Sequence, residues 1–255
     1  MNDLLAADLQ RILWRPMTRA IGVFGVVVAA AVGVIVFVHT ARHPSFATRT
    51  ELRAAVAAAV VPLAFACYTL GASALGADYT SRAPTTLLTW EPRRRLVLAA
   101  RAGASALVTA GLSLFLLLAL VLALLPSAIA HGTGGAPDGA WYLSMAAMTL
   151  RCIVFTAAMS VVGVAAAAIG RSTTAAVIGI IGYLLLFEYT TVQAAPSIAR
   201  WLLFTDAISW IGQNSHTTVG APAGHTVVIG GLLVAAGTAV LCVLAARVFE
   251  RRDVT

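Results

Sequence analysis

The sequence predicts an all-α integral membrane protein with six transmembrane helices, an N-terminal interfacial amphipathic helix, and short re-entrant or interfacial helices before the last span. Hydrophobic residues make up 60% of the 255 residues and charged residues 11%, against roughly 25% charged residues in a soluble domain. Six apolar stretches reach the roughly 20 residues that a helix needs to cross a bilayer. None of them alternates with period two, which favours helices over a barrel. We expect residues 1–255 to form a single transmembrane domain.

Residues 1–19 precede the first apolar stretch and have a different pattern. Leu5, Leu9, Ile12 and Leu13 share one helical face, with acidic residues early and arginines late, as the helix dipole prefers. We interpret this segment as an amphipathic helix on the inner membrane surface. A simple positively charged flank of the first span is the alternative.

The expected spans alternate in charge at their ends. Seventeen arginines and no lysine occur; twelve arginines fall in segments on the side of the N-terminus, four on the opposite side, and Arg151 lies within a span. This distribution predicts a multi-pass protein of a bacterial inner membrane with both termini in the cytoplasm. The net charge of +7 then reports topology, and we expect no nucleic-acid partner. The expected spans are residues 20–38, 54–75, 102–125, 141–169, 173–191 and 226–246.

Residues 192–225, between the fifth and sixth expected spans, are too many for a tight turn. They contain the apolar stretch "ARWLLFTDAISWI", which is too short to cross the membrane. Trp201 and Trp210 suit the headgroup level. We expect re-entrant or interfacial helices here that cap the outer side of the bundle.

Residues 76–101, between the second and third spans, gather charge in an otherwise apolar chain. A positive-inside anchor would need only the three consecutive arginines at 93–95. That reading leaves the apolar face of Leu87, Leu88 and Trp90 unexplained. We therefore interpret residues 85–95 as a short helix that docks a soluble partner.

This layout resembles the permease subunits of type-two ATP-binding-cassette exporters. Those proteins share the cytoplasmic amphipathic helix, the six spans, the short outer helices and the inner loop between spans two and three. The ending "VFERRDVT" is similar to the basic tail of the family, and the usual lysine before span three is an arginine here. The matching loop residues are Gly76, Asp78, Thr86, Leu87, Leu88, Pro92, Arg94 or Arg95, and Arg101.

The resemblance implies that two permease subunits, as a homo- or heterodimer, form a path for an amphipathic substrate such as a drug, antibiotic, lipid or peptide. A separate ATPase subunit would bind ATP and Mg²⁺ and supply the force. A P-loop requires a lysine, which this chain lacks, so we expect no cofactor and no catalytic residue in the chain itself. The expected ATPase-coupling residues are Asp78, Thr86, Leu87, Leu88, Trp90, Glu91, Arg94 and Arg95.

Three other classes of protein were weighed. A membrane enzyme would need a catalytic motif such as H-E-x-x-H or G-x-S-x-G, and neither occurs. An ion-coupled transporter would use charges within the membrane, for which only Arg151 and Glu188 compete. We expect these two residues to form a buried pair, with Arg151 reaching the outer surface alone as the alternative. An accessory membrane subunit without its own path is the third alternative. The histidines and cysteines have no metal-ligand spacing, so we expect no metal site.

Overall fold

The structure is a computed structural model that describes residues 2–42, 46–80, 94–133, 138–199, 201–212 and 227–251. It confirms the helical fold and the number of apolar stretches, because six helical segments in this part of the chain are long and apolar enough to cross a membrane. These are α2 (Pro16–Arg42), α3 (Thr48–Thr80), α5 (Arg94–His131), α6 (Gly139–Gly170), the continuous run of α7 (Thr173–Gly182), η1 (Tyr183–Glu188) and α8 (Tyr189–Ala194), and α11 (Val227–Arg251).

The helices are longer than the apolar stretches that predict them. The second stretch covers residues 54–75 and the third covers 102–125, whereas α3 and α5 extend one to two turns beyond them at each end. A hydropathy pattern detects the thickness of the hydrocarbon. A helix satisfies its own backbone and can continue into the polar interface. Helix ends therefore lie outside the limits that the pattern sets.

Helices α3 and α6 form the centre of the bundle, and α6 has the most buried apolar stretch of the six. Their backbones approach closely at two glycines. A Cβ atom on Gly71 would overlap the Ser160 carbonyl group, and one on Gly163 would overlap the Tyr68 carbonyl oxygen. Such small residues let membrane helices pack without a side chain between them. No room is left for a path between these two helices.

The amphipathic helix α1 (Asn2–Leu13) packs against α5. Ile12 is buried, and Leu5 and Leu9 are partly buried against the same core. Leu13, expected on the same face, is 50% exposed, because the helix ends there before α2 begins at Pro16. The apolar face of α1 is therefore buried against the bundle at Ile12 and exposed at Leu13.

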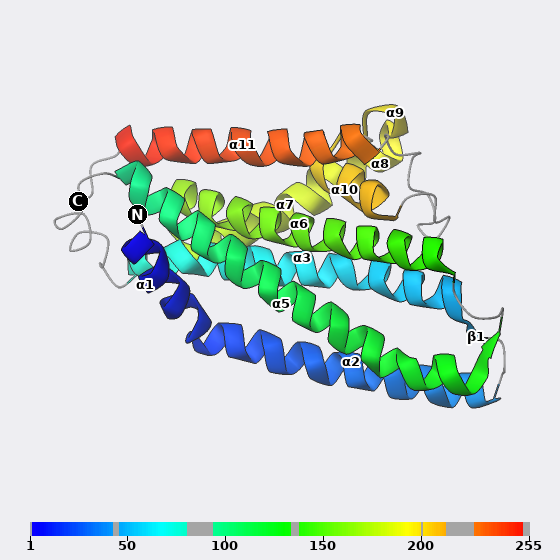
Figure 1. The fold of residues 1–255 in the computed structure, drawn as a ribbon. Helices are drawn as coiled ribbons and strands as arrows, with labels where there is room; N and C mark the ends of the chain where they lie inside the picture. The colour runs from blue at the N-terminus through cyan, green and yellow to red at the C-terminus, as the bar shows by residue number, and fades with distance from the viewer. Residues whose placement is uncertain are drawn as a thin grey trace.

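The two ends of the bundle differ in their short elements (Figure 1). Helix α1 and the C-terminal end of α11 lie at one end, which we call the terminal end. The opposite end carries α9 (Pro196–Ala199) and α10 (Leu203–Gly212). There β1 (Phe46–Ala47) also pairs in parallel with β2 (Gly132–Thr133), which ties two helix connections together. The short helices that the sequence predicts before the last span are thus present as α9 and α10.

Candidate functional site

A buried aspartate at the terminal end of the bundle binds arginines from two neighbouring segments. The side chain of Asp78, on α3, is 4% exposed. Arg11 of α1 donates from Nη2 to Asp78 Oδ1 at 2.6 Å, and Arg101 of α5 donates from Nη1 to Asp78 Oδ2. Arg15, between α1 and α2, places its Nη2 atom 3.7 Å from Asp78 Oδ1. Three guanidinium groups therefore surround one carboxylate.

The same arginines also bind the backbone of α3 and a second carboxylate. Arg15 Nη1 donates to the Ser73 carbonyl oxygen at 2.6 Å, and Arg101 Nη1 donates to the Ala74 carbonyl oxygen at 2.7 Å. Asp8 Oδ1 lies 3.5 Å from Arg101 Nε. Three cations against two anions leave one excess positive charge. We call this group the arginine–aspartate cluster; its members are Asp8, Arg11, Arg15, Asp78 and Arg101.

Burial sets the electrostatics of the cluster. The side chain of Arg101 is 3% exposed and that of Arg15 is 16% exposed, whereas Arg11 is 44% exposed. Burial lowers the pKa of Arg15, the positive charge of Arg11 lowers it further, and Asp8 raises it. An arginine nevertheless stays protonated at neutral pH. The buried charges are therefore tolerated only because each one has an opposite charge or a carbonyl group as a partner.

The cluster holds both ends of the connection between α3 and α5. Asp78 lies two residues before the end of α3 at Thr80, and Arg101 lies seven residues after the start of α5 at Arg94. Both side chains bind α1, through Arg11 and Asp8. The cluster therefore links α1, α3 and α5 to each other on both sides of this connection.

The charged loop is shorter than the sequence predicts, because the expected loop of residues 76–101 includes helical residues at both ends. Gly76 and Asp78 belong to α3, and Arg101 belongs to α5. A Cβ atom on Gly76 would overlap Thr173, so the missing side chain allows α3 to continue beside α7 where the loop was expected to begin. The connection itself is residues 81–93.

Most of the expected coupling residues lie in that connection, outside the described residues: Thr86, Leu87, Leu88, Trp90 and Glu91. Arg94 is the first residue of α5, and nothing is described of its side chain. Arg95 follows it on α5 and is exposed. The structure thus places Asp78 within the cluster and Arg95 beside the connection, and the docking role of the others stays a prediction.

The two charges within the spans bind opposite ends of α10 (Leu203–Gly212). Glu188 is buried at the end of the π-helix η1, and its Oε1 atom accepts hydrogen bonds from Thr205 N at 2.5 Å and from Thr205 Oγ1 at 2.8 Å. Arg151, on α6, donates from Nη1 to the Trp210 carbonyl oxygen at 2.8 Å. A carboxylate at the first turn of a helix and a cation at its last turn both interact favourably with the helix dipole. Glu188 and Arg151 therefore clamp α10 from its two ends.

This arrangement differs from the direct ion pair that the sequence predicts between Arg151 and Glu188. No ion pair joins these two side chains among the described residues. The short helix competes successfully for both charges, because its backbone offers an amide group to one and a carbonyl group to the other. Arg151 is also only partly buried, whereas its position in the span predicted full burial.

No group of three or more His, Cys, Asp or Glu side chains suited to a metal ion occurs among the described residues. The cysteines are free thiols; Cys67 and Cys152 are buried, and Cys242 is partly buried. The described polar groups therefore bind helices to each other, and the functional candidates are the arginine–aspartate cluster and the clamp on α10.

Sequence reasoning missed the partners of Asp78. Arg11 and Arg15 were expected only as the positive side of an interfacial helix, and Asp8 only as an acid near its start. One signal was present: Asp8, Arg11 and Arg15 recur at spacings of three and four, which would place them along one side of a helix, although α1 itself ends at Leu13. No known protein family matches this chain, and no curated protein matches its sequence.

Proposed function

We propose that the chain is the transmembrane permease subunit of an ATP-driven exporter, in which a separate ATPase subunit docks on residues 85–95, at the connection between α3 and α5 and at a cytoplasmic terminal end. One observation carries the proposal: the arginine–aspartate cluster fixes both flanks of this connection to a third helix. Docking can move a membrane helix only if the docked segment is held rigidly at its ends. Asp78 and Arg101 supply that attachment, because both are buried and both bind α1.

The substrate class in this proposal is an amphipathic molecule such as a drug, antibiotic, lipid or peptide. In the same proposal, α1 lies at the inner membrane interface. The composition supports the division of labour, since the chain has no lysine with which to build a P-loop. ATP and Mg²⁺ would then bind to the partner subunit.

The proposal is tested by comparing Trp90→Ala with Arg94→Ala in the full chain, tagged and purified from its native membranes. A buried aromatic anchor often contributes about 2 kcal/mol or more to an interface, whereas an exposed rim charge contributes about 1 kcal/mol or less. We expect Trp90→Ala to release a co-purifying ATPase or to uncouple Mg-ATP hydrolysis from transport, and Arg94→Ala to do much less.

If the arginines serve only as a membrane anchor, the order reverses, and Trp90→Ala behaves like the unaltered chain. A chain that purifies intact without any ATPase, even after cross-linking in the membrane, would contradict the proposed function altogether.

An ion-coupled transporter is the second candidate, and one atom favours it. Glu188 Oε2 is buried and has no hydrogen-bond partner among the described residues, and a carboxylate of this kind within a span is a candidate ion or proton site. The two functions separate in reconstituted vesicles: transport that needs only a proton or sodium gradient, without ATP, would favour this second candidate.

A further inference from the structure

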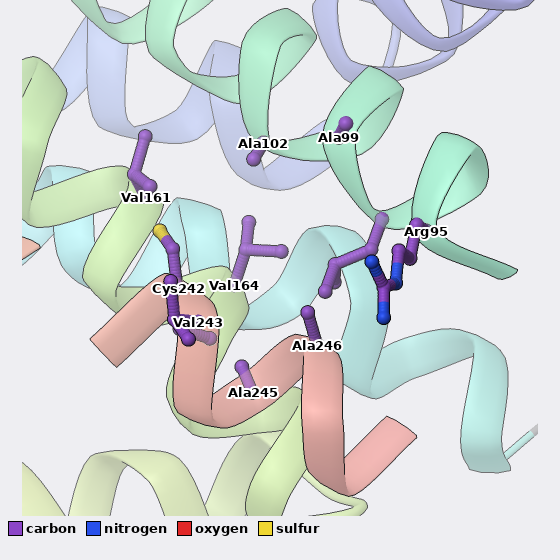
Figure 2. Close-up of a pocket in the computed structure, with 11 residues that line it drawn as sticks. Arg95, Ala99, Ala102, Val161, Val164, Cys242, Val243, Ala245 and Ala246 are labelled. Carbon is purple, nitrogen blue, oxygen red and sulfur yellow. The ribbon is translucent and has the colours of Figure 1, made fainter. Parts of the chain in front are cut away.

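A groove at the terminal end of the bundle is lined, among the described residues, by one basic residue and otherwise by apolar ones (Figure 2). It has a volume of about 390 Å³ and lies between α5, α6 and α11. Its described lining includes Leu98 and Ala102 of α5, Val164 of α6, and Cys242 and Ala246 of α11. Arg95 is the single charged residue among the described residues that line it. Its guanidinium group is turned toward α11 in the close-up.

The lining fits a molecule with one apolar chain and one negative group. The groove volume falls within the range of about 300–1,000 Å³ that is usual for small-molecule sites. Alanines make up much of its wall, at positions 99, 102, 165, 245 and 246, and their small side chains leave the space open. An apolar lining of this kind accommodates an acyl chain.

The depth of Arg95 indicates the kind of negative group. The candidate span of α5 begins at Arg95, seven residues before the apolar stretch of residues 102–125, so Arg95 lies about 10 Å outside that stretch at 1.5 Å per residue, on the headgroup side. A guanidinium group binds phosphate oxygens in pairs. Basic pockets between membrane helices on the cytoplasmic side are typical sites for anionic headgroups.

The short length of the groove argues against a partner helix as its occupant. Residues 95–102 of α5 line it over about 10 Å at 1.5 Å per residue, whereas a crossing helix would need a wall about 30 Å long. We propose that the groove binds one anionic phospholipid of the membrane, with an acyl chain between α5, α6 and α11 and its phosphate on Arg95. This site requires that these helices cross a membrane, and it does not require the export function.

Cys242 provides a reporter inside the groove. It is partly buried in the lining, whereas Cys67 and Cys152 are fully buried in the core. Alkylation of the purified full chain by N-ethylmaleimide in neutral detergent should therefore occur mainly at Cys242. A lipid chain in the groove will cover this thiol and slow its alkylation.

The probes are phosphatidylglycerol and phosphatidylcholine with the same acyl chains, titrated into the detergent solution. We expect phosphatidylglycerol to protect Cys242 at an about fivefold lower concentration, the ratio that one basic residue at the membrane surface typically provides. Arg95→Gln should abolish this difference. Arg247→Gln is the matched control, because Arg247 is exposed next to Ala246 on α11 but is not among the groove residues.

Three results would overturn the inference. Equal protection by the two lipids would show that the headgroup charge is not recognised. Equal loss of the preference in Arg95→Gln and Arg247→Gln would show a general surface effect. Protection that depends on protein concentration and not on lipid would show that a second copy of the chain covers the groove. If Arg95→Gln fails to fold, native mass spectrometry of the unaltered chain decides, because equal retention of the two lipids refutes the site.

Discussion

Replacing Asp78 by asparagine tests whether the arginine–aspartate cluster is an essential attachment. The substitution keeps the shape of the side chain and removes its charge, so that Arg101, with a side chain 3% exposed, loses its main partner. Removing one partner of a buried ion pair typically costs about 3–5 kcal/mol. The amide group of asparagine also brings a donor against the donors of Arg11 or Arg101. We therefore expect Asp78→Asn to destabilise the purified chain by about that amount, or on the order of 10 °C in thermal midpoint.

The matched control is Arg11→Gln, which breaks the same ion pair from its exposed side. The side chain of Arg11 is 44% exposed, and Asp78 keeps Arg15 and Arg101 as partners in its absence, so the loss should be about 1 kcal/mol or less. The assay is thermal unfolding in detergent followed by tryptophan fluorescence. In the double variant Asp78→Asn with Arg101→Gln, part of the loss should be recovered, because no unpaired buried cation remains. Equal effects of Asp78→Asn and Arg11→Gln would refute the reasoning.

Two further predictions concern the clamp and the core. In the double variant Arg151→Glu with Glu188→Arg, both charges interact unfavourably with the dipole of α10. We therefore expect it not to recover the thermal stability that each single change loses. Full recovery would instead support a direct pair. Gly163→Ala should destabilise the chain by about 1–3 kcal/mol through overlap with the Tyr68 carbonyl group, whereas Gly111→Ala, which meets no atom within 4 Å, should be neutral or slightly stabilising in the same unfolding assay.

The sequence predicts the six apolar helices well because each one is encoded locally, in a single run of hydrophobic residues. The partners of its buried charges are not encoded in this way. Arg11 and Asp78 are 67 positions apart, and nothing in either neighbourhood indicates that the other is close. The prediction paired Arg151 with Glu188 from their depth alone. Depth cannot show that each of these side chains binds one end of α10 in place of the other side chain. Hydropathy thus gives the spans, whereas side-chain pairing depends on how the spans pack.

If the chain is an exporter subunit, its path cannot run between α3 and α6, because their backbones are in contact near Gly71 and Gly163. The groove beside Arg95 and a cavity lined by Gly33 and Phe37 both lie at the surface of the bundle. We therefore expect the path to use an outward face. Helices α2, α7 and α11 each keep most of their apolar surface uncovered.

An apolar helix face can contact lipid without a free-energy penalty and needs no protein partner for stability. A transport path, however, needs a second wall. We therefore expect a second permease subunit to face α2, α7 or α11, and the working protein to contain two copies or two related chains. Cysteines introduced at Phe24 of α2, Phe187 of η1, which continues α7, and Val240 of α11, all exposed, should give a disulfide-linked dimer at the true interface after mild oxidation in native membranes. Leu118 of α5, also exposed, serves as the control position. Recovery of only monomer at all three positions, with the ATPase still bound, would contradict a two-permease path.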